Sequence, residues 1–173
     1  MPWTAPQFPR QGPPFVAGER QMLDGWLDYH RYTLLTKCAG LTAEQLRQRA
    51  TPPSSLSLLG IVRHMTDVER GWFRHRVAGE EHGYLYSSDA DPDGEFDNVD
   101  AADPEQDLAT YLGEIDLARQ AAAGHGLDET FFHERRKTEM SVRWVYVHMI
   151  EEYARHNGHA DLLRERIDGT VGM

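Results

Sequence analysis

Four stretches of helical periodicity constrain the fold of this chain more than any other feature. Apolar residues recur at helical spacing over residues 18–39, 57–78, 104–123 and 141–167, and a glycine follows each stretch directly or after one residue. Glycine commonly ends helices because it adopts the left-handed conformation without steric cost. No segment shows the convincing alternation of polar and apolar residues that a strand would need. The sequence therefore predicts an all-α fold, an up-down four-helix bundle.

The amino-terminal segment differs in composition from the rest. Residues 1–17 hold five prolines and few periodic apolar positions. We expect an extended arm that either lies on the surface or is docked by Trp3, Phe8 and Phe15. The predicted organisation is this arm followed by one domain over residues 18–173.

Composition limits the partners and the compartment. The formal net charge of −10 argues against nucleic acid or an anionic membrane as partner, since both require a basic face. No apolar run reaches the roughly 18 residues of a membrane span, and the first residues do not resemble a signal peptide. A single cysteine, Cys38, excludes an internal disulfide and fits a small core residue. These features favour a cytoplasmic protein without a nucleic-acid or membrane partner, and they leave a homodimer open.

A stripe of metal-ligating side chains runs along the last predicted helix. Its members are His148, Glu152, His156 and His159. At about 100° per residue these four positions fall within about 80° of one another, so they share one face. Val145 and Leu163 bracket the stripe, which indicates that it faces the interior or a cleft. A solvated polar stripe is the alternative, but four such residues favour a metal site that needs a further ligand from another element.

His64 is the candidate for that further ligand. It lies on the same side of the second long helix as Ile61 and Val68, so it points toward the core. A lone histidine on an apolar face is more often a hydrogen-bonded core residue than a ligand. Opposite a ligand pair on the last helix, it becomes the obvious missing ligand. His75 and His82 lie near the end of that helix, where solvation is the simpler interpretation.

An acidic loop over residues 80–103 offers a second candidate cation site. The spacing of an EF-hand calcium loop is matched by Asp89, Asp91, Asp93, Gly94 and Asp100. Against calcium, Pro92 interrupts the loop, an aspartate replaces the final glutamate, and no entering helix precedes it. We expect a solvated acidic loop, and we expect a polar connection over residues 125–140.

Two segments resemble a known family. SLSLLGIVRHMTDVER and VYVHMIEEYARHNGHADLLRE are similar to the DinB/YfiT-like metal-binding four-helix-bundle proteins, and the resemblance covers most of residues 18–168. This family includes thiol-dependent maleylpyruvate isomerases and thiol S-transferases. It implies a metal held by His64, Glu152 and His156, the glutamate variant being the isomerase-like one. The chain looks most similar to a subgroup of small single-domain actinobacterial proteins. The isomerase-like members carry a further carboxy-terminal domain that this sequence lacks, so maleylpyruvate isomerisation itself is not expected.

The resemblance also implies the chemistry. We expect a divalent-metal-dependent transferase or isomerase that activates a low-molecular-weight thiol, of the mycothiol or bacillithiol type, against a small electrophile. Two histidines and one carboxylate favour zinc, with nickel, iron or manganese as alternatives.

Residues near the triad are candidates for catalysis or for support of the metal ligands. His159 and Glu151 are the candidate catalytic residues, either of which could serve as the base if the protein were instead a metal-dependent hydrolase. His148, Asp67 and Arg155 are expected to surround the ligands. A third alternative is a bundle that binds metal without catalysis. A cavity of roughly 300 Å³ or more beside the metal would favour an enzyme.

Overall fold

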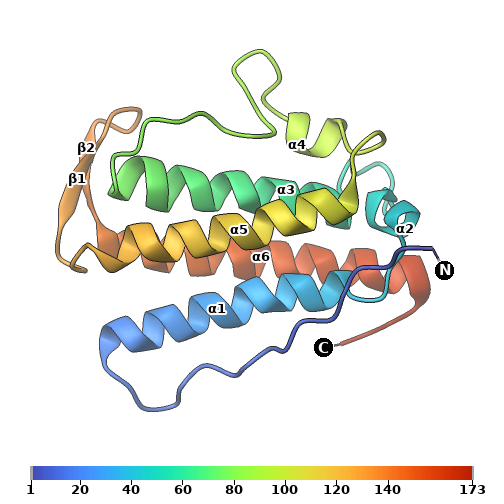
Figure 1. Cartoon of the computed structure of the whole chain (residues 1–173), viewed down its shortest axis with the longest axis horizontal. Coiled ribbons are helices and arrows are strands. Elements are labelled where there is room, and N and C mark those ends of the chain that lie inside the picture. The colour runs from blue at the N-terminus through green and yellow to red at the C-terminus, as the bar shows by residue number, and fades with distance from the viewer. Residues whose placement is uncertain (1, 173) are drawn as a thin grey trace.

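The computed structural model describes residues 2–172, which are mostly helical with one small antiparallel sheet (Figure 1). The elements in chain order are α1 (Glu19–Cys38), α2 (Ala43–Arg47), α3 (Leu58–Glu69), η1 (Arg70–Val77), α4 (Gly94–Asp97), α5 (Pro104–Ala123), β1 (Thr130–His133), β2 (Thr138–Ser141) and α6 (Val142–Asp168). The element η1 is a π-helix that continues α3 without a break. The predominance of helix is as predicted.

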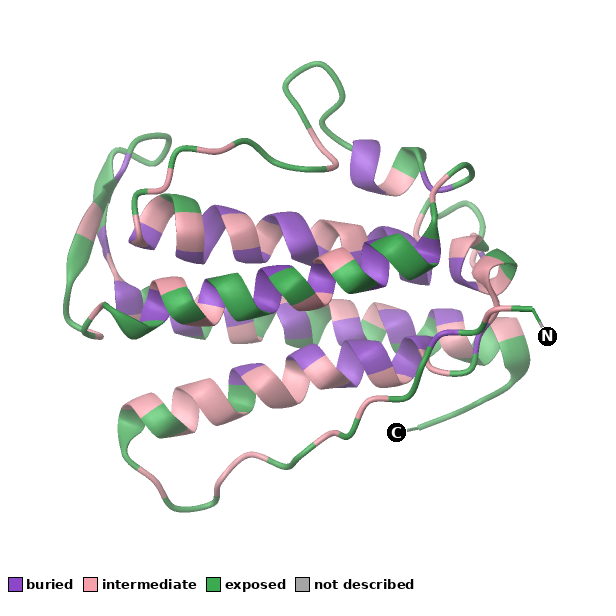
Figure 2. Ribbon diagram, in the orientation of Figure 1, coloured by how far each residue is buried: buried purple, intermediate pink, exposed green. Residues whose placement is uncertain are grey.

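The long helices α1, α3 with η1, α5 and α6 lie side by side along the molecule (Figure 1). α1 packs on α6, and α5 packs on α3 and η1. Their facing sides carry the buried apolar residues, which include Leu34, Leu59, Ile115 and Met149 (Figure 2). Among the described residues, no helix combines the length and apolarity needed to cross a membrane.

Side-chain caps and glycines mark the ends of the long helices. The side chains of Ser57, Asp103 and Ser141 accept hydrogen bonds from backbone N–H groups of the first turns of α3, α5 and α6. These bonds satisfy donors that have no partner within the helix. Gly40 and Gly169 follow α1 and α6 with φ of 77° each, a conformation that glycine adopts freely. Sequence reasoning therefore located these boundaries to within one or two residues.

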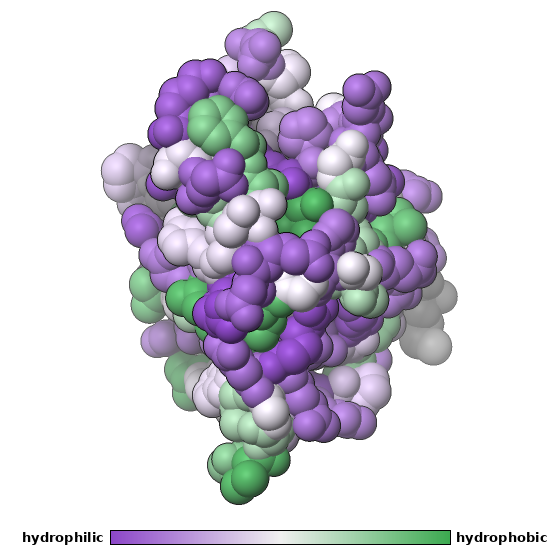
Figure 3. Space-filling view, turned by 90° about the vertical axis from the view of Figure 1, so that its left-hand side faces the viewer, coloured by the Kyte–Doolittle hydropathy of each residue, from purple (hydrophilic) through white to green (hydrophobic). Residues whose placement is uncertain are grey.

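The hairpin of β1 and β2 corrects the polar connection expected over residues 125–140. Phe131 pairs with Met140 across the hairpin, and Lys137 adopts a φ of 51° in the turn. Each strand spans only four residues, too few for a visible alternation of polar and apolar side chains. The face of the molecule on this side is mainly hydrophilic, with separate hydrophobic patches (Figure 3).

The proline-rich segment lies against the ends of α1 and α2. Ala5 exchanges backbone hydrogen bonds with the turn after α1, with Ala5 N 2.9 Å from Leu41 O and Gly40 N 2.8 Å from Ala5 O. Trp3 and Phe8 pack against the core. Phe15 is fully exposed, so its predicted role as an anchor is wrong.

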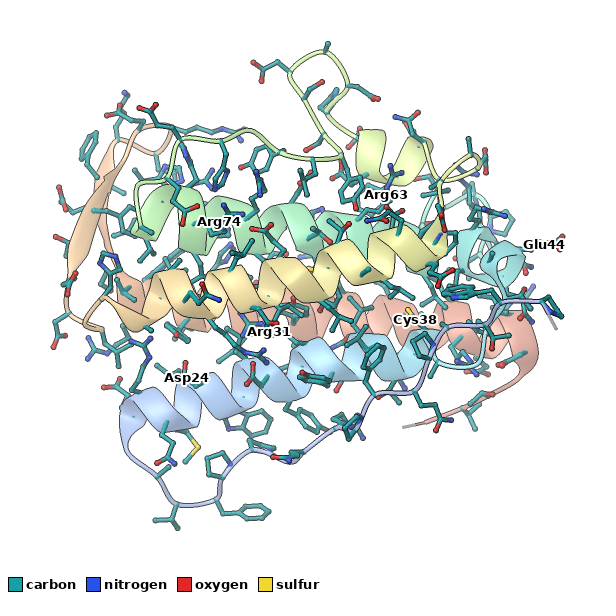
Figure 4. The ribbon with its side chains drawn as sticks, in the orientation of Figure 1. Asp24, Arg31, Cys38, Glu44, Arg63 and Arg74 are labelled. Carbon is teal, nitrogen blue, oxygen red and sulfur yellow. The ribbon has the colours of Figure 1, made fainter. Side chains whose placement is uncertain are left out.

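A buried charged network joins the four long helices. Arg31, which projects from α1 (Figure 4), donates from Nε and Nη2 to the two carboxylate oxygens of Glu69 on α3 at 2.7 and 2.6 Å. The Tyr153 hydroxyl on α6 donates to Glu69 at 2.7 Å, and the Tyr111 hydroxyl on α5 donates to that of Tyr153 at 2.9 Å. All four side chains are buried. Because each long helix contributes one member, the network links their relative positions.

Candidate metal centre

Three side chains from two helices converge on one point. His64 on α3 faces Glu152 and His156 on α6, and each of the three offers a ligand atom within 4.8 Å of the other two. Glu152 and His156 are four residues apart, which places them on the same face of α6. Among the described residues, no other group of three histidine, cysteine, aspartate or glutamate side chains has this geometry. The structure brings together the triad that the sequence singled out, and its role as a ligand set stays a prediction.

His64 is held in place by α4. Its Nδ1 lies 3.1 Å from Oε1 of Glu95, which is buried and belongs to α4. A carboxylate accepts hydrogen bonds, so Nδ1 carries the proton and Nε2 keeps its lone pair for a cation. Phe96 stacks on the His64 ring with the centroids 5.2 Å apart. A Cβ on Gly60 would lie 3.0 Å from Phe96 Cδ1, so glycine at this position lets α4 approach α3.

Sequence reasoning missed Glu95. It lies within the acidic segment that we expected to be a solvated loop, and only the docking of α4 on α3 reveals its contact with His64. Burial by itself would raise the pKa of Glu95, but hydrogen bonds from His64 and the backbone outweigh that effect and leave the pKa below its usual value. Glu95 is therefore a carboxylate at neutral pH. Its second oxygen, Oε2, is buried without a hydrogen-bond partner among the described residues.

The polar stripe on α6 forms a continuous row. Nε2 of His148 lies 3.5 Å from one oxygen of Glu152, and Nε2 of His156 lies 3.6 Å from the other. The rings of His156 and His159 meet edge to face with their centroids 5.4 Å apart. Burial, together with the neighbouring His64, His159 and Arg155, lowers the pKa of His156 to about 4.

The donor set fits a divalent cation. His156 is neutral near pH 7, and an imidazole must be neutral to bind a metal. Its Nδ1 is buried without a hydrogen-bond partner among residues 2–172, as is Nδ1 of His159. A buried polar atom without a partner is unfavourable. Two imidazoles and one carboxylate are a common ligand set for zinc with a further position for water or substrate.

The other candidate residues lie in different environments. The side chain of Glu151 is 68% exposed, and its carboxylate lies 3.4 Å from Nδ1 of His148. Arg155 is exposed. Asp67 is buried, and its carboxylate accepts the backbone N–H groups of residues 85–87, which fixes the start of the acidic loop against α3. The catalytic role of His159 and Glu151 stays a prediction, as does support of the ligands by His148, Asp67 and Arg155.

The aspartates of the EF-hand-like segment do not converge. Asp91 accepts a hydrogen bond from Asn98 Nδ2 at 2.7 Å, and Asp100 pairs with Arg49 at 2.7 Å. Asp91 therefore makes a contact within the loop, and Asp100 contacts Arg49, which follows α2.

A cavity of about 170 Å³ adjoins His64. It is lined by His64, Asp67, Val68, Gly71, Trp72, Arg76, Tyr84, Ser87 and Glu95. This volume is below the roughly 300 Å³ that we expected of an enzyme site. A second cavity of about 210 Å³ shares Gly71, Arg76 and Tyr84 with the first. The space beside His64 therefore suits a small group, and a second cavity adjoins part of the same lining.

The π-helix η1 brings Arg76 to this cavity. Arg76 follows His64 by twelve residues, which in an α-helix would place it about 120° away around the axis. A π-helix has more residues per turn and rotates less with each residue, so η1 turns Arg76 back toward the side of His64. Sequence reasoning assumed a regular α-helix here and therefore missed Trp72, Arg76 and Tyr84.

Comparison with known proteins identifies the family of this chain. The family model described as mycothiol S-transferase matches residues 22–169, a range that includes all three members of the triad. No curated protein and no solved structure gives a significant match. Because the match spans most of the chain, this protein belongs to the mycothiol S-transferase family.

Proposed function

We propose that this protein is a metal-dependent mycothiol S-transferase that joins the thiol sulfur of mycothiol to a small electrophile. The observation that carries the proposal is the convergence of His64, Glu152 and His156, with ligand atoms within 4.8 Å of one another beside a cavity. Membership of the mycothiol S-transferase family supports the thiol and the class of reaction.

The proposed scaffold is an up-down four-helix bundle over residues 18–173, preceded by an arm over residues 1–17. In such bundles, metal sites are assembled from side chains on facing helices. The position of His64 on α3 opposite Glu152 and His156 on α6 agrees with that arrangement. A cytoplasmic location and a homodimer remain predictions from the sequence alone.

Each residue of the site has a task in this proposal. His64, Glu152 and His156 would hold the metal, for which zinc is our first expectation. A bound divalent cation would stabilise the deprotonated, nucleophilic form of a thiol near neutral pH. Glu95 keeps the proton of His64 on Nδ1, and the cavity beside His64 admits the electrophile. We rank hydrolysis lower, because Glu151, one of the two bases considered for it, is exposed and contacts His148.

The first experiment measures metal content and thiol transfer together. Protein purified without a histidine tag should contain close to one equivalent of metal, and it should conjugate mycothiol to a model electrophile only when the metal is present. We expect His64→Ala to lose both properties. The matched control is His75→Ala, because His75 lies on the same continuous helix and contacts the following loop, at Glu80 O and at the His82 ring, away from the triad.

A second readout separates thiol transfer from hydrolysis. With cobalt in the site, binding of mycothiol should produce a charge-transfer band in the near ultraviolet, since thiolates are soft donors. His156→Ala should abolish the band, and Cys38→Ser should leave it unchanged because Cys38 is buried. Ester hydrolysis without the band and without thiol transfer would reverse our ranking of the two activities.

A further inference from the structure

Arg76 lines the cavity beside His64, and it has no carboxylate partner among the described residues. Its Nη1 donates to the backbone oxygen of Gly71 at 2.7 Å, its Nη2 to the Tyr84 hydroxyl at 3.1 Å, and its Nε lies 3.2 Å from Nε2 of His133. None of these partners is an acid. Among the described residues, no carboxylate lies within ion-pair distance of Arg76.

The neighbouring arginines of η1, unlike Arg76, have carboxylate partners. Arg70 pairs with Glu114 at 3.0 Å, and Arg74 pairs with Glu114 at 2.8 Å and with Glu80 at 2.7 Å. The protein as a whole has ten more acidic than basic residues. Carboxylates are therefore abundant, yet Arg76, whose guanidinium lines the cavity beside His64, has none.

The surroundings of Arg76 fix its position. Its guanidinium lies over the ring of Trp72, with Cζ 4.7 Å from the ring centroid. A Cβ on Gly71 would lie 2.9 Å from Nη1 of Arg76 and 2.8 Å from Cε1 of Tyr84, so the absence of a side chain at Gly71 makes room for both groups. A guanidinium that is already ordered loses little side-chain entropy when it binds a ligand.

Arg76 retains hydrogen-bonding capacity. A guanidinium has five N–H donors, and the three contacts of Arg76 engage at most three of them. Two acidic groups line the same cavity. Asp67 accepts from three backbone N–H groups and from the Ser87 hydroxyl, and Glu95 contacts His64 through one oxygen, while its Oε2 has no hydrogen-bond partner among the described residues. Arg76 and the candidate metal ligand His64 therefore line one cavity.

We propose that Arg76 binds a carboxylate of the electrophilic substrate, so that the enzyme prefers small electrophiles that carry a negative charge. This inference rests on the proposed function and names the class of its second substrate. A cavity of about 150 Å³ holds a benzene ring, so the 170 Å³ beside His64 suits a ring-sized substrate. The guanidinium fork matches the geometry of a carboxylate, and the reacting carbon would lie near His64, which lines the same cavity.

The test uses two electrophiles that differ only in charge. In 4-(chloromethyl)benzoate and 4-(chloromethyl)benzamide, the mycothiol sulfur forms a bond to the methylene carbon, the carbon–chlorine bond breaks, chloride leaves with the bonding electrons, and the thiol proton passes to solvent. We expect kcat/KM for the benzoate to exceed that for the benzamide by about 10- to 100-fold, mainly through KM, as a charge-assisted hydrogen bond would give.

Two variants assign the preference to Arg76. Arg76→Gln should bring the ratio of the two kcat/KM values close to one, and Arg76→Lys should retain part of the preference through its charge. The matched control is Arg136→Gln, because Arg136 also lies over a tryptophan, with Cζ 5.7 Å from the Trp144 centroid, but does not line the cavity. It should keep the wild-type ratio. A preference that survives in Arg76→Gln would place the carboxylate elsewhere, for example on the metal, and would overturn the proposal.

Binding without turnover separates this inference from the proposed function. Calorimetry of the metal-loaded protein should show that benzoate binds at least about tenfold more tightly than benzamide, and this measurement needs neither thiol nor reaction. Tighter binding of benzoate that Arg76→Lys weakens and Arg136→Gln preserves supports the anion site even if no transfer occurs. Because this comparison uses Arg76→Lys, it can be made even if Arg76→Gln does not fold. Thiol transfer at equal rates to both electrophiles, with equal binding of benzoate and benzamide, would overturn the inference and leave the transferase intact.

Discussion

Glu95 is the residue whose contact most directly affects a candidate metal ligand, His64. Carboxylates that hold a ligating histidine fix its tautomer and orientation, and their removal typically weakens metal binding 10- to 100-fold. We expect Glu95→Gln to weaken metal affinity by about that factor, measured by competition with a chromogenic chelator. The control is Asp97→Asn, which removes an exposed carboxylate from the same short helix α4. Equal affinity in Glu95→Gln and wild type would show that Phe96 and the backbone position His64 without the carboxylate.

Cys38 lacks the exposure and the low pKa of a reactive thiol. Burial raises the pKa of Cys38 to about 12, and none of its surface is exposed. The thiolate is the reactive form of cysteine, so iodoacetamide at pH 8 should not label the native protein. It should label one cysteine after denaturation in guanidinium. Rapid labelling of the native protein would mean that Cys38 is accessible and could compete with an external thiol.

The helical elements are joined by the network of Arg31, Glu69, Tyr153 and Tyr111. Arg31→Met would leave the carboxylate of Glu69 buried without its cation, which typically destabilises a protein by about 3–5 kcal/mol. Tyr153→Phe removes the hydrogen bond to the Glu69 carboxylate and the acceptor of the Tyr111 hydroxyl, and it should cost about 1.5–3 kcal/mol. Chemical denaturation should rank the variants in this order. Similar losses from both would indicate that Glu69 becomes protonated or hydrated once Arg31 is gone.

The predictability of these elements depends on whether their signals are local. Ser57, Asp103, Ser141 and Gly169 cap neighbouring backbone groups, so the helix ends could be predicted from the sequence. The triad could also be predicted, because Glu152 and His156 share one helix face. The contact between Glu95 and His64 depends on the conformation of the loop over residues 80–103. No periodic pattern in the sequence predicts that conformation. The π-helix likewise leaves no pattern in the sequence, and it is the element that carries Arg76 to the cavity.

At the scale of the whole molecule, metal binding should couple to global stability. The candidate ligands come from α3 and α6, so a bound ion connects two of the long helices. A ligand at 100 times its dissociation constant stabilises the folded state by about 2.7 kcal/mol. For a chain of this size, 1 kcal/mol corresponds to roughly 2–4 °C, so we expect zinc to raise Tm by about 5–10 °C.

Calorimetric scans of protein stripped by a chelator and then reloaded measure this shift. His64→Ala should lose it and His75→Ala should retain it. Calcium should change Tm little, because the aspartates of residues 89–100 hold loop contacts such as Asp91 to Asn98 and do not converge on one point. A large shift with calcium that persists in His64→Ala would place the cation in the acidic loop. The same shift with zinc in wild type and His64→Ala would contradict the triad, because the ion would then bind without its ligand from α3.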